Sequence, residues 1–435
     1  MGHLASPEPP YRKLQQRLDR NITGAPDSPE FMQILRLLFS PEEADIARQM
    51  PMQFMSLSKL ARKLGTPAEP LAAKLANMAA RGLVFDMEHD GRRYFALAPV
   101  VIGFFEFTFM RVREDYPTAE LARLFDAYLY EDERFARAVF GGQTQIGRSL
   151  VREEALPAGD HIEILDWERA SHIVATASSY AVSLCPCRHH AQHLDRACEH
   201  PLRTCLSLNA GAELLSRSGL AEPITRQEAM SILEQSKGAG LAQTADNVQR
   251  QVSYICNCCG CSCGMMNAIR RFEIRSAIVS SNWLSDINPA VCKGCGRCVK
   301  ACPVGAISIV KTAEKGPRRQ HAECDPEMCL GCGVCYSACK HGALTMRARE
   351  RRVFTPETTF DRVVAMAIER GKLGDLLLDN TEGWTSHALG RILHVLEKTP
   401  PAQALVAVGP LKSVFLGGIV KGARLGAGKA QAKMM

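Results

Sequence analysis

The sequence predicts an α+β protein in which helical domains flank a cysteine-rich middle and a small metal-binding module. Three observations predict this class. Apolar residues recur at helical spacing through much of residues 31–152 and again after residue 350. The segment LVFDMEHDGRRYFALAP turns at Asp90-Gly91, a pair that favours a β-hairpin. All eighteen cysteines fall between residues 185 and 339, as in chains that fold partly around bound metal.

The order of these patterns divides the chain into five parts. The first part is rich in proline, and a polar break near residues 152–162 separates the next two. The parts are a flexible leader at 1–29, a winged-helix-like and helical domain at 30–152, a cysteine-rich helical domain at 153–285, a small domain built on an internal repeat at 286–348, and a helical extension with a basic tail at 349–435.

Several segments carry clear helix signals. Thr225 and Glu228 have the spacing of a capping box and predict a helix over RQEAMSILEQSKGAG. Thr355 followed by Pro356 predicts the start of a helix in the C-terminal extension. The segment WERASHIVATASSYAV is expected to be one helix that leads directly into Cys185.

Composition narrows the class of protein. With 46% hydrophobic and 23% charged residues, and no run of about 20 apolar residues, the chain reads as globular and without a transmembrane helix. The N-terminal stretch is polar and lacks the apolar core of a signal peptide. Thiols of intracellular chains usually bind metal instead of forming disulfides. We therefore expect a cytoplasmic protein whose cysteines hold metal.

An internal repeat occupies the downstream half of the cysteine-rich region. A shift of 37 residues lays CKGCGRCVKACPVGAISI (292–309) on CLGCGVCYSACKHGALTM (329–346). Each half has the spacing C-x₂-C-x₂-C-x₃-C, in which three cysteines surround one iron–sulfur cluster and the fourth reaches the other. Two zinc sites are the alternative, but zinc usually joins two C-x₂₋₄-C pairs that are distant in sequence.

This repeat resembles the bacterial two-cluster [4Fe–4S] ferredoxin family over about residues 286–348. The resemblance implies two crossed ligand sets. One consists of Cys292, Cys295, Cys298 and Cys339, and the other of Cys329, Cys332, Cys335 and Cys302. The first half keeps the family's proline as Pro303, whereas Lys340 replaces it in the second half and would change the potential of the nearby cluster. Cys324 lies outside the pattern and is expected to be a buried free thiol.

Nine further cysteines precede the repeat in two groups. Neighbours this close cannot all form disulfides, whereas a C-x-C pair places two thiolates within reach of one metal core. We expect both groups to share one or two [4Fe–4S] clusters; seven cysteines with a histidine, one larger cluster, and a zinc–thiolate cluster are alternatives. The cysteines are Cys185, Cys187, Cys198 and Cys205 in the first group and Cys256, Cys258, Cys259, Cys261 and Cys263 in the second.

The first group also contains basic side chains. His189, His190, His193 and His200 are expected on the polar surface of a loop. Arg188 follows Cys187 directly, and two interpretations stand: a surface arginine, or a guanidinium close enough to a cluster to stabilise its reduced state.

The C-x-C-R and N-C-C-x-C-x-C blocks of this region resemble a segment of uncharacterised iron–sulfur proteins of anaerobic bacteria, where they precede a dicluster ferredoxin. That resemblance implies a larger multi-cluster protein but no particular activity. Cys258-Cys259-Gly260 is also similar to the C-C-G element of heterodisulfide-reductase-type subunits, which carry a catalytic noncubane cluster. Here the companion C-x₂-C pair is Cys292 and Cys295 of the repeat itself, which argues against that assignment.

Residues 31–98 resemble a winged helix in the order of their expected elements. Within PAEPLAAKLANMAARG, only Lys74, Asn77 and Arg81 have side chains suited to contact DNA, whereas DNA-reading helices usually carry a denser basic surface. The net charge of +7 counts every cysteine as neutral, and each [4Fe–4S] core with four thiolates adds about −2. We expect a protein-interaction or homo-oligomerisation module here and no DNA partner.

The C-terminal segment GPLKSVFLGGIVKGARLGAGKAQAKMM combines one apolar face with scattered lysines and arginines. This pattern is typical of a helix that lies on an anionic membrane surface. Docking on the protein's own core or on a partner is the favoured interpretation. If the segment instead lies on the membrane surface, the protein would be peripheral on the inner face of the membrane.

The function expected from these features is electron transfer. A line of [4Fe–4S] clusters would pass single electrons between a donor and a partner oxidoreductase complex. We therefore expect the chain to be an electron-transfer subunit and not a stand-alone enzyme. The sequence contains no nucleotide-binding fingerprint. Two alternatives belong to other classes: a redox-sensing winged-helix transcription regulator, and a reductase whose upstream cluster is catalytic.

Overall fold

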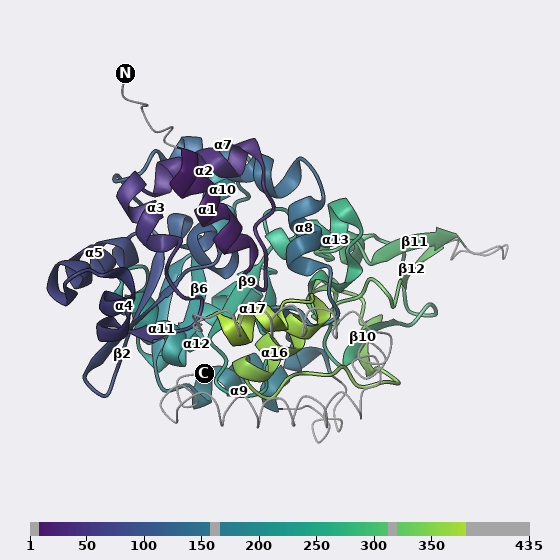
Figure 1. Ribbon diagram of the computed structural model, residues 1–435. Coiled ribbons are helices and arrows are strands. Elements are labelled where there is room, and N and C mark those ends of the chain that lie inside the picture. Colours follow the sequence, from purple (N-terminus) through teal and green to yellow (C-terminus); the bar gives the residue numbers. More distant parts are fainter. Residues whose placement is uncertain (1–7, 157–165, 312–319, 380–435) are drawn as a thin grey trace. The chain divides into compact units, whose positions relative to one another are not determined.

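The computed structural model describes residues 8–156, 166–311 and 320–379 (Figure 1). They form two compact units. The first contains the chain up to Thr144, residues 216–220 and the segment from Thr358, and the second contains residues 145–215 and 221–357. The second unit begins at Gln145, whereas the sequence predicted a boundary between residues 152 and 153. The boundary lies earlier because residues 147–149 form an edge strand in the sheet of the second unit.

The N-terminal segment is helical where the structure describes it, so the expectation of a flexible leader over residues 1–29 is wrong for residues 8–19. They form α1 (Glu8–Asp19), which packs against α2 (Pro29–Leu38) and α3 (Pro41–Ala47). The prolines of α1 lie in its first turn, where a missing amide hydrogen is tolerated. Tyr11, Leu14 and Leu18 are buried, and this apolar face holds the helix in place.

A small helix-and-hairpin arrangement follows in the first unit. Its three-stranded sheet has the order β1-β3-β2, and the hairpin turns at Asp90 and Gly91 with φ values of 50° and 67°. The elements are β1 (Met55–Ser56), α4 (Leu57–Leu64), α5 (Ala68–Ala80), β2 (Val84–His89) and β3 (Arg92–Leu97). Their order agrees with the expected one, and the assignment to the winged-helix class stays a prediction.

Aromatic side chains form the core of the rest of this unit. The rings of Phe31 and Tyr128 stack with centroids 4.7 Å apart, and those of Phe105 and Phe125 meet at 5.2 Å. The remaining helices are η1 (Val100–Phe104), α6 (Phe105–Phe109), α7 (Thr118–Tyr130), α8 (Arg134–Phe140), α16 (Thr359–Glu369) and α17 (Leu373–Leu378).

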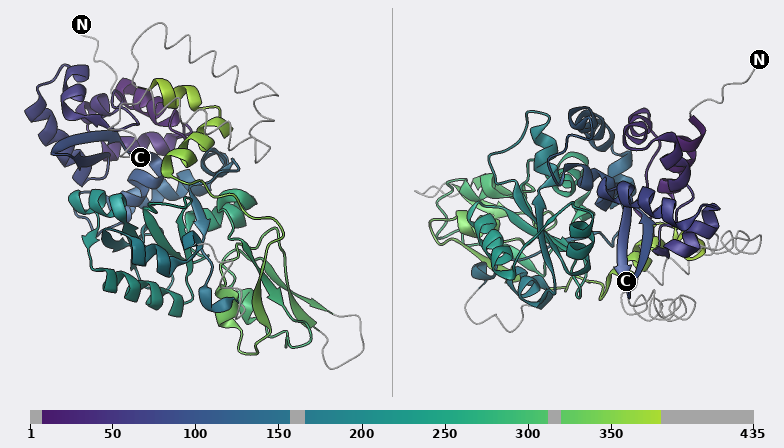
Figure 2. Two further views of the ribbon diagram at one scale, coloured as in Figure 1. Left: turned by 90° about the horizontal axis from the view of Figure 1, so that it is seen from below. Right: turned by 90° about the vertical axis from the view of Figure 1, so that its left-hand side faces the viewer.

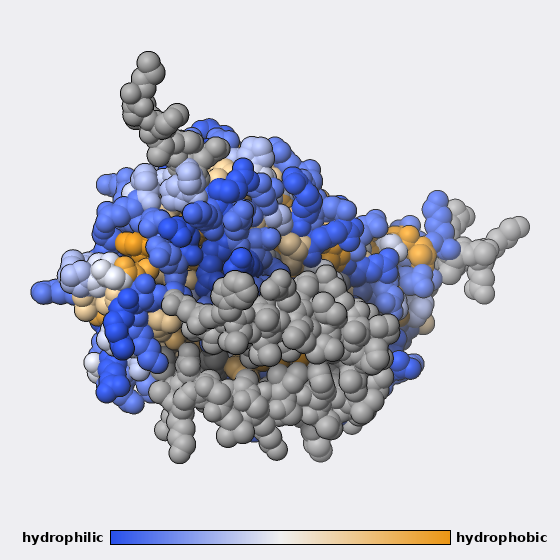
Figure 3. All heavy atoms as spheres, in the orientation of Figure 1, coloured by the Kyte–Doolittle hydropathy of each residue, from blue (hydrophilic) through white to orange (hydrophobic). Residues whose placement is uncertain are grey.

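The C-terminal extension begins later than its sequence signal indicated. Thr358, not Thr355, caps α16, and it forms a capping box with Asp361. The expected membrane-surface helix within residues 409–435 lies outside the described residues. In the ranges that the structure describes, no helix is both long and apolar enough to cross a membrane. On the face shown in Figure 3, the described surface is mostly hydrophilic, with small separate apolar areas.

A six-stranded antiparallel sheet organises the cysteine-rich part of the second unit, so the expectation of a helical middle is wrong. The strand order is β4-β8-β9-β6-β5-β7. The segment expected as one helix before Cys185 contains the short helix α9 (Ala170–Thr176) and then a strand, β5. The strands are β4 (Gly147–Ser149), β5 (Tyr180–Leu184), β6 (Arg203–Leu208), β7 (Glu222–Pro223), β8 (Ala242–Asp246) and β9 (Tyr254–Cys258).

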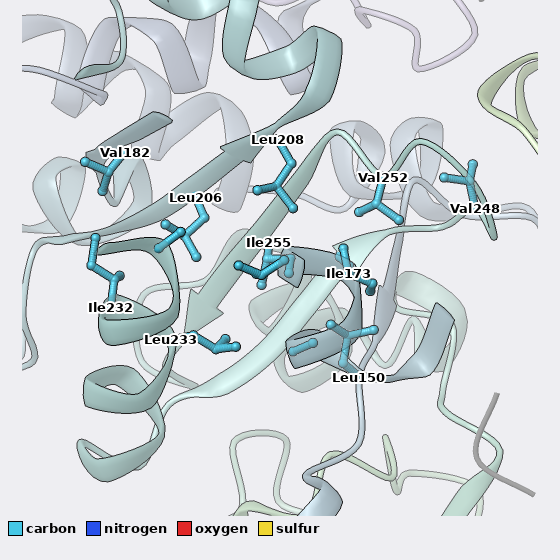
Figure 4. Close-up of a cluster of buried hydrophobic side chains, with 14 residues drawn as sticks. Leu150, Ile173, Val182, Leu206, Leu208, Ile232, Leu233, Val248, Val252 and Ile255 are labelled. Atoms are coloured by element: carbon cyan, nitrogen blue, oxygen red, sulfur yellow. The ribbon is translucent and has the colours of Figure 1, made fainter. Parts of the chain in front are cut away.

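One face of this sheet packs against α9 and α12 (Arg226–Gly238). Figure 4 shows Val182, Leu206 and Ile255 of the strands meeting Ile173, Ile232 and Leu233 of the helices in one apolar cluster. The capping box expected at the start of α12, between Thr225 and Glu228, is confirmed. The other helices of the region are α10 (Pro186–Gln192), α11 (Asn209–Arg217) and α13 (Gly264–Phe272).

The internal repeat folds into a pseudo-symmetric module in the same unit. Each half places a short helix after its second cysteine, and the two helices pack against each other. Two antiparallel pairs, β10 with β13 and β11 with β12, complete it, and the second pair projects from the rest of the unit (Figure 2). The elements are β10 (Trp283–Ile287), α14 (Arg297–Ala301), β11 (Ile307–Lys311), β12 (Gln320–Cys324), α15 (Val334–Ala338) and β13 (Leu344–Ala348).

Candidate metal centres

One cysteine set of the repeat encloses a cavity. Its four thiols are those of Cys302, Cys329, Cys332 and Cys335, and they line a small cavity together with apolar side chains including Val304, Leu330 and Met346. Three of these cysteines come from the second half of the repeat and one from the first. The structure therefore brings together the crossed set that the resemblance implied; we call it the enclosed quartet.

Hydrogen-bond donors surround the sulfurs of the enclosed quartet. The Gly331 amide lies 3.4 Å from Cys329 Sγ, and the Ala306 amide lies 3.2 Å from Cys302 Sγ. The Cys335 thiol donates to Ser285 Oγ at 3.4 Å. The two amide donors stabilise sulfur that carries negative charge. The surroundings of these sulfurs therefore stabilise the thiolate form.

Burial opposes free thiolates at the same place. Desolvation raises the pKa of Cys335 to about 12 and also raises that of Cys332. A coordinated metal removes the proton outright, because it replaces the proton as the positive partner of the sulfur. These thiols therefore ionise most readily when they bind metal.

Two arginines from outside the repeat pattern lie against the enclosed quartet. Arg152 is 2% exposed; its amide donates to Cys332 O at 3.3 Å and its guanidinium donates to Lys237 O and Leu241 O at 3.0 Å. Arg349 donates to Cys329 O at 2.6 Å. Burial lowers the pKa of both arginines, and the neighbouring thiolates oppose that shift. Their positions in the sequence carry no signal that would have identified them.

The other set of the repeat, Cys292, Cys295, Cys298 and Cys339, is more open, and we call it the open quartet. Cys292 Sγ accepts hydrogen bonds from the amides of Gly294 and Ala322, both at 3.4 Å. Cys292, Cys298 and Cys339 lie in one packed cluster that also includes Cys302 and Cys335 of the enclosed quartet, and Cys295 is exposed. The exposed thiol gives this quartet a more direct route to the surface than the enclosed quartet has, where Cys302 and Cys329 are only half-buried.

Cys324 lies beside the enclosed quartet. It is half-buried, not fully buried as expected, and it hydrogen-bonds with Cys329. This hydrogen bond lowers the pKa of Cys329 to about 6 and raises that of Cys324. The thiol outside the repeat pattern therefore supports one within it.

Six of the nine upstream cysteines form one buried or half-buried network. Hydrogen bonds run in a chain through the thiols of Cys185, Cys187, Cys263, Cys258, Cys256 and Cys205. The bonds from neighbouring thiols hold the pKa values of Cys187 and Cys258 well below the usual range. Both cysteine-rich segments contribute, as expected from the sequence, and we call this set the six-thiol group.

The other three upstream cysteines form a separate set. The sulfurs of Cys198, Cys259 and Cys261 all lie within 4.8 Å of one another, and those of Cys198 and Cys259 are 3.7 Å apart. In the described ranges, no other three cysteine, histidine or acidic side chains meet this closely. The nine cysteines are therefore divided into six and three, and we call the smaller set the three-thiol group.

Arg188 is buried between the two upstream groups, so the surface interpretation of this residue is wrong. Its side chain donates to Asn257 O and Pro201 O at 3.0 Å and approaches Cys259 Sγ at 3.8 Å. Burial alone would lower its pKa, but the thiolates of Cys185 and Cys259 raise it, and the net shift is upward. The guanidinium thus provides fixed positive charge to both groups.

The histidines of the first segment do not all lie on the surface. His189 and His190 are buried, which contradicts the expectation of a polar surface loop, and His193 and His200 are half-buried. The rings of His189 and His193 meet with centroids 4.9 Å apart. His189 and His190 lie in α10, which begins at Pro186, and His193 caps its C-terminal end, so α10 is an internal element and not an exposed loop.

The cysteine loop after β9 lies directly against the enclosed quartet. A Cβ atom added to Gly260 would collide with the backbone of Pro303, which follows Cys302 and lines the cavity. Arg270 fixes the loop by donating to Gly260 O at 2.8 Å. Only glycine permits this approach, which places the upstream cysteine loop next to the enclosed quartet.

Comparison with known protein families finds one match. Residues 291–343 match the family model of the 4Fe-4S dicluster domain. No curated protein and no solved structure matches the chain. The match includes all eight cysteines of the repeat, and it leaves the upstream sheet and the first unit without a counterpart.

Proposed function

We propose that this 4Fe-4S dicluster domain makes the protein an electron carrier that passes single electrons between a donor and a partner oxidoreductase. The bound clusters supply reversible one-electron transfer. The chain holds them, sets their potentials through charge and hydrogen bonds, and keeps water away from the enclosed one. The observation that carries the proposal is the crossed set of four thiols around one cavity.

The ligand assignment follows from the two quartets. Cys302, Cys329, Cys332 and Cys335 would hold one [4Fe–4S] cluster, and Cys292, Cys295, Cys298 and Cys339 the other. The amides that approach Cys329, Cys302 and Cys292 would donate to the coordinated sulfurs. Because Cys295 is exposed, the open quartet is the side from which a soluble partner would reach the chain.

A third centre would lie in the six-thiol group. Its thiols are numerous enough to ligate an iron–sulfur cluster, and its loop contacts the backbone beside the enclosed quartet at Gly260 and Pro303. Close approach of redox centres favours electron transfer between them. We infer a path from the open quartet through the enclosed quartet to the six-thiol group.

The first unit would serve as a protein-interaction or oligomerisation module. Lys74 of α5 and Arg81, which caps the C-terminal end of that helix, are the basic side chains suited to contact phosphate, and they pair with Glu42 and Glu43 of α3. This pairing reduces the positive charge that α5 presents, which opposes DNA binding. The ion pairs therefore favour the electron-carrier function over that of a redox-sensing transcription regulator.

The proposal is tested by anaerobic purification of the full chain, iron and sulfide analysis, and electron paramagnetic resonance of the reduced protein. We expect iron in excess of the roughly eight ions that two [4Fe–4S] clusters require. Cys302→Ser should remove about four irons and one of the signals. Cys324→Ser changes no proposed ligand and keeps a hydroxyl that can hydrogen-bond with Cys329, so it is the matched control and should keep both signals.

Two results would overturn the electron-carrier assignment. One is zinc in place of iron in both quartets. The other is a Cys302→Ser protein that keeps its full iron content and both signals, because the crossed arrangement requires that cysteine.

A further inference from the structure

Beyond electron transfer, we propose that the three-thiol group binds a single tetrahedral divalent ion of the zinc class, separate from the iron–sulfur clusters. The ligands are Cys198, Cys259 and Cys261. The ion would occupy its own site next to the cluster path, with a fourth coordination position that no His, Cys, Asp or Glu side chain fills among the residues that the structure describes.

The spacing of the sulfurs is that of a single ion. Zinc binds thiolate sulfur at about 2.3 Å in tetrahedral geometry, which places two such sulfurs about 3.8 Å apart. Cys198 Sγ and Cys259 Sγ are 3.7 Å apart, and all three sulfurs lie within 4.8 Å of one another. A single ion at the centre of this triangle therefore reaches every ligand without a change of backbone.

The same chain provides a comparison with cluster-type spacing. In a [4Fe–4S] cluster each thiolate binds a different iron, so the cysteine sulfurs lie farther apart than around one ion. Neither quartet of the repeat contains three sulfurs within 4.8 Å of one another, in the part of the chain that the structure describes. The three-thiol group is thus distinguished from both by its geometry.

Charge and exposure around the site fit a zinc-class ion. Three thiolates and one divalent ion sum to about −1, and Arg188, whose guanidinium lies 3.8 Å from Cys259 Sγ, supplies the compensating positive charge in the interior. Cys259 is buried and Cys198 half-buried, whereas Cys261 is exposed. The fourth position therefore opens toward solvent, where water or an external ligand completes the tetrahedron, as in zinc sites that keep an open position.

Metal analysis of the full chain, purified anaerobically, tests the site. We expect one zinc per chain in the parent protein. Cys261→Ser, a change at an exposed residue that should not disturb folding, is expected to lose this ion while iron content and the reduced paramagnetic signals stay unchanged. Cys198→Ser should behave in the same way. Cys324→Ser is the matched control, since it removes a thiol of the same unit outside the set, and it should keep the zinc.

X-ray absorption at the zinc edge gives an independent readout. The expected shell contains three sulfurs at about 2.3 Å and one lighter atom. Cys261→His should retain the ion with one sulfur fewer, because imidazole is a good zinc ligand. Loss of one iron per chain in Cys261→Ser, in place of one zinc, would support a single-ion site and identify the ion as iron.

Three outcomes would overturn the single-ion site. The first is a loss of about four irons in Cys261→Ser, which would mean that these cysteines hold a cluster. The second is no change of any metal in either serine variant. The third is a zinc shell that contains only oxygen and nitrogen, which would make the ion adventitious. None of these outcomes bears on the two quartets, so this proposal and the electron-carrier assignment fail independently.

Discussion

The two quartets of the repeat share one cysteine spacing but have different surroundings. The enclosed quartet lines a cavity, and two arginines, the buried Arg152 and the half-buried Arg349, lie against the backbone of its cysteines. The open quartet has backbone amides as donors and an exposed thiol, Cys295. A duplicated ligand pattern thus makes two sites whose chemistry is set by segments outside the duplication.

The difference predicts a direction for electrons. Positive charge beside a cluster stabilises its reduced state, and exclusion of water reduces the screening of that charge, whereas burial by itself disfavours the more negative reduced state. We predict that the charge of the arginines outweighs the burial, so that a cluster in the enclosed quartet has the higher potential and electrons that enter at the open quartet move inward. The inner site is also the one that Gly260 approaches through Pro303, so the predicted gradient would lead toward the six-thiol group.

The largest expected effect comes from removing one ligand in each quartet. Cys332→Ala in the enclosed quartet leaves a buried iron without a ligand, and we expect loss of about four irons and of that cluster's signal. Cys295→Ala in the open quartet leaves a site that water reaches, and we expect most of the cluster's iron to remain. Iron analysis of both variants measures the contrast, and equal losses would show that exposure does not distinguish the two sites.

A smaller effect is expected from the two equivalent glycines that precede α14 and α15. Gly296 and Gly333 have φ values of 73° and 78°, so alanine is strained at both positions. An added Cβ meets nothing within 4 Å at Gly296, but at Gly333 it lies 3.0 Å from Arg152 Cβ. We expect Gly333→Ala to lower the free energy of unfolding by about 1 kcal/mol more than Gly296→Ala.

Denaturant unfolding under anaerobic conditions measures this difference. Gly296→Ala is the matched control, because it has the same backbone strain without the contact to Arg152. Equal destabilisation of the two variants would mean that Arg152 does not constrain the enclosed quartet.

The next effect concerns potential. Arg152→Met removes a buried cation beside Cys332, and we expect the potential of the enclosed cluster to fall by on the order of 50 mV, since 59 mV corresponds to about 1.4 kcal/mol for one electron. Lys293→Met removes an exposed cation beside Cys292, where solvent screens the charge, and the open cluster should shift by less. Redox titration followed by paramagnetic resonance measures both. A larger shift in Lys293→Met would reverse the comparison.

Much of the metal chemistry was predictable because its ligands are close in sequence. The spacing around Cys292 and Cys329 identified the repeat, and the family match confirms a dicluster domain there. Both halves of the crossed set lie within one module, so the structure brings Cys302 to the second half as the resemblance implied. The charges next to them were not predictable, since Arg152 comes from a segment about 180 residues upstream of the cysteine it contacts.

The sheet of the second unit escaped prediction for a physical reason. Its strands bury polar side chains, among them Gln243, Thr244 and Asn257, so they lack the alternation of apolar and polar residues that identifies a strand. These polar groups are satisfied by partners: Asn257 donates to Thr204 O at 2.8 Å and Thr244 Oγ1 lies 3.3 Å from Cys258 Sγ. The division of the upstream cysteines into six and three depends on where this sheet places β9 relative to α10, which no local pattern encodes.

The smallest expected effect separates the quartets by the reactivity of one thiol. Cys329 hydrogen-bonds with Cys324, and the corresponding position in the first half of the repeat is occupied by Ile287, which has no thiol to offer. In metal-free protein the bond lowers the pKa of Cys329 to about 6. The thiolate, which is the reactive form, should therefore be present above pH 6 and lost as the pH falls below it.

Alkylation of Cys329, followed by mass spectrometry across pH 5–9, measures this pKa. We expect the half-maximal rate near pH 6, whereas an ordinary thiol reaches it near pH 8.5. Cys324→Ala removes the hydrogen bond while burial remains, and burial alone raises a thiol pKa, so the midpoint should move upward by more than one pH unit. A midpoint that stays near pH 6 in Cys324→Ala would assign the shift to the amide of Gly331 and to Arg349 instead, and Cys324 would then have no part in the asymmetry of the two quartets.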